Sequence, residues 1–85
     1  MKENKEILKK QIIYRSMHRG SKEMDLLLGN FVKKYVEEFN INELKDLEDL
    51  LFIEDDVIYK WYIKKKFDKL VPKTKVSEML KNFKL

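Results

Sequence analysis

The 85-residue chain contains no cysteine, one histidine, two glycines and one proline. Without cysteine it can form no disulfide, no thiolate nucleophile and no cysteine-ligated zinc site. A single histidine cannot build a histidine-based metal site. Two glycines nine residues apart cannot form a glycine-rich phosphate-binding loop. We therefore expect no metal site and no catalytic residue, and we predict that the chain is not an enzyme.

The sequence also lacks a run of about 18 apolar residues, so it predicts no direct membrane insertion. Its first ten residues, MKENKEILKK, have no apolar stretch long enough for a secretion signal. They are also too acidic for a typical mitochondrial transit peptide. We expect a cytoplasmic protein of bacterial type, or a protein of the mitochondrial matrix if a presequence is missing.

Arginine is scarce, because 17 of the 19 basic residues are lysines. The net charge of +4 is unevenly distributed: residues 1–36 carry +5, residues 37–56 carry −8 and residues 57–85 carry +7. Phosphate binding needs positive charge on one face, and arginine binds phosphates and base edges better than lysine does. We expect no nucleic-acid partner, although a small Lys-rich helical nucleic-acid-binding module stays open as an alternative.

Helix-forming residues dominate the chain, and the β-hairpin dipeptides Asn-Gly and Asp-Gly are absent. Apolar residues recur at spacings of three and four, as on the buried face of a helix. The pattern predicts an all-α protein, a compact five-helix bundle in a single domain over residues 1–85, with frayed ends at 1–4 and 84–85. Four of the predicted helices run from about Asn4 to Met17, from just after Gly20 to about Glu38, from Asn40 or Asn42 through Leu51, and from Asp55 or Asp56 to the lysines at 64–66. The fifth follows Thr74 and has the apolar face Val76, Met79, Leu80 and Phe83.

Several helix ends carry residues that typically cap a helix. The predicted N-caps are Asn4, Asn40 paired with Glu43, Asp55 or Asp56, and Thr74. The first helix has a less regular apolar pattern than the others. The residues expected on its buried face are Ile7, Leu8, Ile12, Ile13, Tyr14 and Met17.

The junction between the first two helices is the most informative segment of the chain. Both arginines, Arg15 and Arg19, lie there in a sequence that otherwise uses lysine. Gly20 follows, and we expect it to adopt the left-handed conformation that commonly ends a helix. Glu23 lies four residues after Arg19, which predicts a charge pair at an exposed tip. A rigid charged corner of this kind is typical of a docking element.

Two blocks of this sequence resemble the succinate dehydrogenase flavinylation factors, called SdhE in bacteria and succinate dehydrogenase assembly factor 2 in mitochondria. The first block is Tyr14-Arg15-Ser16 followed by Arg19-Gly20-x-x-Glu23 and Asp25. The second is Leu50-Leu51, Glu54-Asp55, Ile58, Tyr59 and Trp61. The resemblance covers roughly residues 5–62. The segment from Trp61 to Pro72 departs from it, being longer, rich in lysine and without the usual glycine after the fourth helix.

The resemblance implies a five-helix bundle that is not itself catalytic. It implies an assembly factor that promotes covalent FAD attachment to the flavoprotein subunit of succinate dehydrogenase, and fumarate reductase could also be served. By position, the implied partner-binding residues are Arg19, Gly20, Glu23 and Asp25, with Arg15 and His18 beside them. Arg19 would pair with a carboxylate or carbonyl of the partner.

The resemblance implies that the partner, and not this chain, binds the FAD. The chain would bind no FAD tightly by itself and would act on the FAD of the flavoprotein. We expect the free chain to be a monomer. A generic protein-interaction module with another partner, or a carrier of FAD, remains an alternative.

Overall fold

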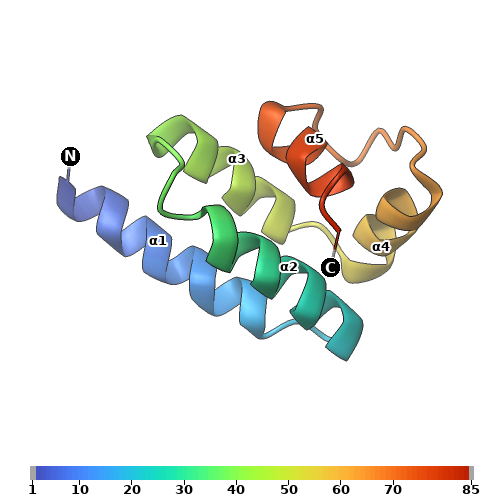
Figure 1. The fold of residues 1–85 in the computed structure, drawn as a ribbon, viewed down its shortest axis with the longest axis horizontal. Coiled ribbons are helices and arrows are strands. Elements are labelled where there is room, and N and C mark those ends of the chain that lie inside the picture. The colour runs from blue at the N-terminus through green and yellow to red at the C-terminus, as the bar shows by residue number, and fades with distance from the viewer. Residues whose placement is uncertain (1, 85) are drawn as a thin grey trace.

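Five α-helices make up most of the chain (Figure 1). The computed structural model describes residues 2–84, with side chains from Asn4 onward. No strand occurs in this part of the chain, so the all-α prediction is confirmed. The helices are α1 (Lys2–Met17), α2 (Lys22–Tyr35), α3 (Ile41–Leu51), α4 (Asp55–Lys64) and α5 (Lys75–Lys81).

The helices pack around one core, and α1 contacts both α2 and α3. Helices α1, α2 and α3 run back and forth beside one another, and α5 packs on α3 and α4 (Figure 1). The radius of gyration is 12.1 Å. A compact domain of this length is expected to have a radius of gyration of about 12 Å. The chain is therefore the compact bundle that the sequence predicts.

The core is apolar and draws on every helix. Phe31 of α2 is fully buried, which contributes on the order of 1.5–3 kcal/mol relative to an exposed side chain. Its ring lies 5.4 Å from that of Phe83, in an edge-to-face arrangement. The hydroxyl of Tyr62 donates to the backbone oxygen of Phe83. These contacts hold the C-terminal end of the chain against α2 and α4.

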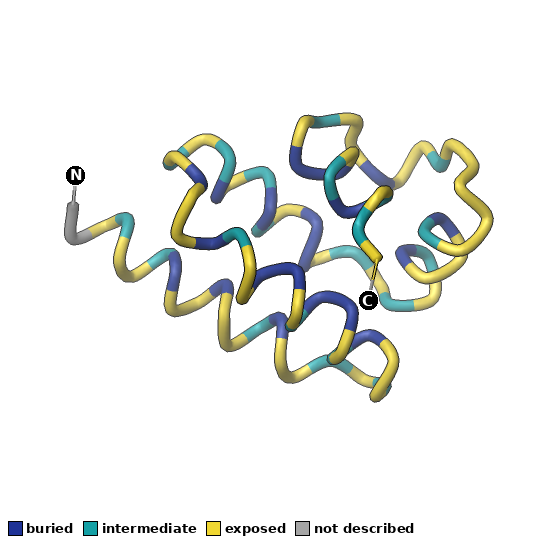
Figure 2. The backbone as a smooth tube through the Cα atoms, viewed as in Figure 1, coloured by how far each residue is buried: buried dark blue, intermediate teal, exposed yellow. Residues whose placement is uncertain are grey.

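Helix α1 differs from its prediction. Of the six residues expected on its buried face, only Ile12 is fully buried, and Ile7, Ile13, Tyr14 and Met17 are exposed. Figure 2 shows how much of α1 faces solvent. The helix is covered on one side only, by α2 and α3, and the buried stripe includes the polar residues Lys9 and Ser16.

The two buried polar side chains of α1 have local partners. The Lys9 ammonium lies 2.7 Å from a carboxylate oxygen of Glu37, and the Ser16 hydroxyl donates to the carbonyl of Ile13 at 2.8 Å. The hydrogen bond to Glu37 raises the pKa of Lys9, and burial opposes this. The spacing of apolar residues does not indicate a buried stripe that contains polar residues. For this reason the predicted buried face of α1 is wrong.

Two predicted helix limits are also wrong. Helix α1 already includes Asn4, so Asn4 is not its cap. Helix α2 ends at Tyr35, three residues before the predicted end near Glu38, and residues 36–38 form a turn. Fraying at the ends of the chain stays a prediction, and residues 1 and 85 lie outside the described part.

The predicted caps of α3 and α5 are confirmed. Asn40 accepts from the Glu43 N–H at 2.9 Å, and Glu43 accepts from the Asn40 N–H at 2.9 Å, which completes a capping box. This backbone hydrogen bond and the nearby Lys75 lower the pKa of Glu43. Thr74 caps α5 in the same way. Helix α4 instead has Glu54 at its N-cap, without a side-chain cap, and Asp55 and Asp56 lie in its first turn.

Helix α4 ends at a lysine in the conformation that glycine usually takes. Lys65 has φ 57°, and it is the only non-glycine residue with positive φ in the part of the chain described. Its ammonium lies 4.3 Å from the centre of the Tyr62 ring and donates to the carbonyl of Lys81. These contacts offset the cost of the left-handed conformation. Among the described residues, no helix combines the length and apolar composition that a bilayer span requires.

Replacing Asn40 by alanine should lower the free energy of unfolding by about 1 kcal/mol, because α3 then loses its side-chain cap. The measurement is urea denaturation followed by far-UV circular dichroism. Asn42→Ala is the matched control, since Asn42 is exposed and lies within the same first turn. Equal stability of the two variants would contradict the role of the cap.

Candidate functional site

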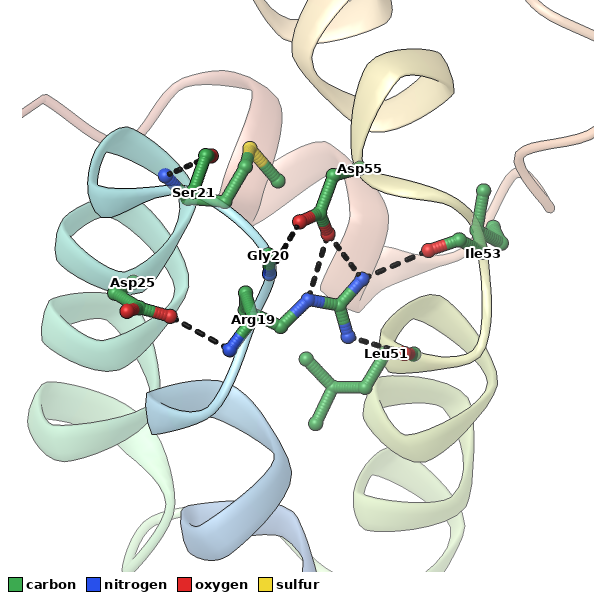
Figure 3. Close-up of polar contacts among 8 residues, drawn as sticks. Arg19, Gly20, Ser21, Asp25, Leu51, Ile53 and Asp55 are labelled. Atoms are coloured by element: carbon green, nitrogen blue, oxygen red, sulfur yellow. Dashed lines mark hydrogen bonds and ion pairs between the residues drawn. The ribbon is translucent and has the colours of Figure 1, made fainter.

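The corner between α1 and α2 is built around Arg19. The side chain of Arg19 is only 10% exposed and points toward the loop between α3 and α4 (Figure 3). Its Nε donates to Asp55 Oδ1 at 2.8 Å, and a terminal nitrogen lies 2.7 Å from the same oxygen. The guanidinium also donates to the carbonyls of Leu51 and Ile53, the latter at 2.8 Å. Each of the three guanidinium nitrogens therefore has an acceptor within the chain.

The backbone of the corner is held by two carboxylates (Figure 3). The Arg19 N–H donates to Asp25 Oδ1 at 2.7 Å, and the Gly20 N–H donates to Asp55 Oδ2 at 3.0 Å. Ser21 then caps α2 by accepting from the Met24 N–H at 3.3 Å. Asp55 thus binds both the side chain of Arg19 and the backbone of Gly20.

Two expectations about the corner are wrong. Arg19 forms no charge pair with Glu23 among the described residues, because its guanidinium is turned inward onto Asp55. The guanidinium bonds within the chain, and its pairing with a carboxylate or carbonyl of a partner stays a prediction. Gly20 has no positive φ, because hydrogen bonds to side chains close the turn instead of a left-handed residue.

Gly20 leaves an open surface rather than filling a tight space. A Cβ atom added there would lie 3.5 Å from Asp55 Oδ2, which is ordinary van der Waals contact. The fold therefore does not require glycine at this exposed position. What glycine does provide is room for another molecule to approach the backbone.

The other predicted residues lie on the rim of the corner. Glu23 is exposed in the first turn of α2. His18 is exposed, stacks on Tyr14 with ring centres 4.0 Å apart, and bonds through Nδ1 to the Tyr14 carbonyl. Arg15 lies 3.3 Å from Glu48 and 4.4 Å from the centre of the Phe52 ring. The structure thus brings all six predicted residues to one corner, with Arg19 and Asp25 engaged inward.

A shallow hollow of about 560 Å³ lies between segments 14–20 and 51–56. Its edges include two aromatic residues, Tyr14 and Phe52, which are 63% and 64% exposed. The apolar pattern predicts Tyr14 on the buried face of the first helix, and the sequence gives no signal that marks Phe52 as a site residue. Exposed aromatic and arginine side chains are enriched at protein–protein interfaces. This hollow has the character of a docking surface.

The site also brings together the two sequence blocks that carry the resemblance. Arg19 and Gly20 belong to the first block, and Leu51 and Asp55 belong to the second. They lie 32 to 36 residues apart in sequence and bond directly. In the described part of the chain, no group of three or more histidine, aspartate or glutamate side chains is arranged to hold a metal ion.

The fold and the site define the class of this protein. It is a small helical bundle in which two sequence motifs meet at one polar corner. Residues 10–84 match the model of a family described as flavinator of succinate dehydrogenase. The chain belongs to this family of succinate dehydrogenase assembly factors, which confirms the resemblance.

Curated relatives agree. The mitochondrial succinate dehydrogenase assembly factor 2 of Scheffersomyces stipitis is 45% identical over 62 residues, which cover 73% of this chain and 42% of that protein. The protein of the same name from Dictyostelium discoideum is 37% identical over 76 residues, covering 89% and 52%. The one from Komagataella phaffii is 36% identical over 62 residues, covering 73% and 33%.

The chain spans about a third to about a half of the length of these curated relatives. They are named as mitochondrial proteins, which overturns our expectation of a cytoplasmic protein of bacterial type. No solved structure matches the chain.

Replacing Arg19 by alanine should lower the free energy of unfolding by about 2–4 kcal/mol, because Asp55 and two carbonyls lose a buried, charged donor. Arg15→Ala is the matched control. Arg15 is 38% exposed, and its loss should cost less than about 1 kcal/mol. Chemical denaturation of both variants measures the difference, and equal effects would show that the inward contacts of Arg19 do not stabilise the fold.

Proposed function

We propose that this chain docks through its α1–α2 corner onto the flavoprotein subunit of succinate dehydrogenase and promotes covalent attachment of FAD to that subunit. The observation that carries the proposal is the meeting of the two motif blocks at Arg19 and Asp55. The fold does not require glycine at position 20, and it does not require the exposed aromatic residues Tyr14 and Phe52 beside it. These features therefore support a docking role for the motif.

In this proposal the corner residues divide into two roles. Arg19 and Asp25 hold the backbone of the corner in shape, and they act on the partner indirectly. Glu23, His18 and Phe52 are exposed around it and make the contacts. Exposed aromatic anchors with charged neighbours are the usual source of binding energy in such interfaces.

The chain acts as a binding protein and not as a catalyst. A rigid bundle can favour one arrangement of a flavoprotein only by binding that arrangement more tightly than the others. The arrangement favoured here is the one in which the partner's own residue reaches the flavin. His18 is not the residue that carries the flavin.

The FAD stays with the partner in this proposal. The phosphates of a dinucleotide need free N–H donors or cationic groups. At the hollow, the Arg19 guanidinium and the Gly20 N–H are both bonded to Asp55, and Glu54 and Asp56 add negative charge to the edge. These residues do not fit tight binding of FAD, and no step is assigned to FAD on this chain.

Glu23→Ala and Phe52→Ala should each lower the covalent flavin of the partner several-fold while the protein stays folded, because both side chains are exposed and Phe52→Ala loses only the contact with Arg15. The chain is co-expressed with the flavoprotein subunit from the same organism, and covalent flavin is read as in-gel fluorescence of the denatured subunit.

Glu38→Ala is the matched control for Glu23→Ala, since Glu38 is exposed and follows the opposite end of α2. Normal flavin content with both corner variants would refute the docking surface. If the wild-type chain does not raise covalent flavin at all, the proposed function itself is wrong.

A further inference from the structure

The segment from Lys60 to Leu70, called here the lysine–apolar segment, exposes large apolar side chains next to uncompensated lysines. It covers the end of α4 and the first part of the loop that leads to α5. Ile63, Phe67 and Leu70 are 55%, 79% and 58% exposed. Figure 2 shows that this loop is mostly exposed. Water-exposed side chains of this size, close together in one segment, are typical of an interaction surface.

Four lysines accompany these apolar residues. They are exposed, and none forms an ion pair with another described residue: Lys60, Lys64, Lys66 and Lys69. The one acid of the segment, Asp68, is half-buried and accepts from the Leu70 N–H at 2.8 Å. The lysine–apolar segment therefore presents apolar side chains together with positive charge that exceeds the charge of its one acid, Asp68.

The fold does not use these side chains. The buried side of α4 consists of Ile58 and Trp61, with Tyr62 packed against the core. Lys65 is the lysine that has internal partners, since it lies over Tyr62 and bonds to Lys81. The exposed residues of the segment are thus free for an external partner.

We propose that the lysine–apolar segment docks on the surface of an anionic lipid bilayer. Lysines near such a surface gain from the negative potential of the headgroups, and their long side chains reach it easily. Ile63, Phe67 and Leu70 can enter the boundary between headgroups and acyl chains, as in interfacial helices. A nucleic acid would use the lysines but offers no apolar surface for the two aliphatic side chains.

This surface is separate from the docking corner. Asp55 and Asp56 at the start of α4 border the corner, whereas the lysine–apolar segment includes the end of α4 and the loop after it. A helix of ten residues is about 15 Å long. The two surfaces use different residues, and the lipid proposal does not depend on the proposed function.

The test is flotation of the full chain with vesicles of phosphatidylcholine containing phosphatidylserine, compared with vesicles of phosphatidylcholine alone. We expect at least about tenfold stronger binding to the anionic vesicles, and loss of this binding at high salt. Absence of binding to anionic vesicles overturns the proposal. So does tighter binding to a DNA duplex or an RNA strand at the same salt concentration.

Two matched pairs of variants locate the surface. Lys64→Glu with Lys66→Glu should weaken vesicle binding about tenfold or more, whereas Lys10→Glu with Lys45→Glu makes the same charge change on α1 and α3 and should leave most binding. Equal loss of vesicle binding in both double variants would mean that net charge alone drives binding. That result would refute the role of the lysine–apolar segment.

Ile63→Ser should weaken binding several-fold, and Ile7→Ser on α1 should not, although each isoleucine is 55% exposed. If Ile63→Ser binds as well as the wild type, insertion of apolar side chains is excluded and the proposal fails. Circular dichroism of all variants confirms that they remain folded.

Discussion

The contact between Arg19 and Asp55 is the constraint on which the corner depends. It joins the turn after α1 to the start of α4, two segments 36 residues apart. A nearly buried guanidinium is costly to remove from water unless its donors are satisfied, and here one carboxylate and two carbonyls satisfy them. Lysine could not replace it, because a single ammonium cannot reach acceptors placed around a planar fork. The shape of the exposed rim follows from this joint.

Much of the fold could be predicted from the sequence, and the main exception is helix α1. Helices α2 and α3 have clear apolar faces and defined N-caps, so local patterns agree with the final packing. Helix α1 has a buried stripe that includes Lys9 and Ser16, and its larger apolar residues face solvent. Apolar periodicity measures where apolar side chains lie, so it cannot find a face that is partly polar.

The candidate site was only partly predictable. Its location came from the sequence motif, since Arg19, Gly20 and Glu23 do lie at one helix corner. The inward direction of the Arg19 side chain was not predictable, because its acceptor Asp55 is distant in sequence and looked like a helix cap. Spacing within a motif shows which residues are near one another along the chain, and it gives no information on a contact formed by another loop.

Part of the uneven charge along the chain has a physical explanation in α4. Asp55 and Asp56 stand at its N-terminus and Lys64 in its last turn, which suits the direction of the helix dipole. The same arrangement places carboxylates beside the corner, where Asp55 binds Arg19, and lysines at the far end of the helix. The two ends of α4 therefore differ in charge. Its start places carboxylates beside the arginines of the corner, and its end presents lysines, which suit an anionic surface.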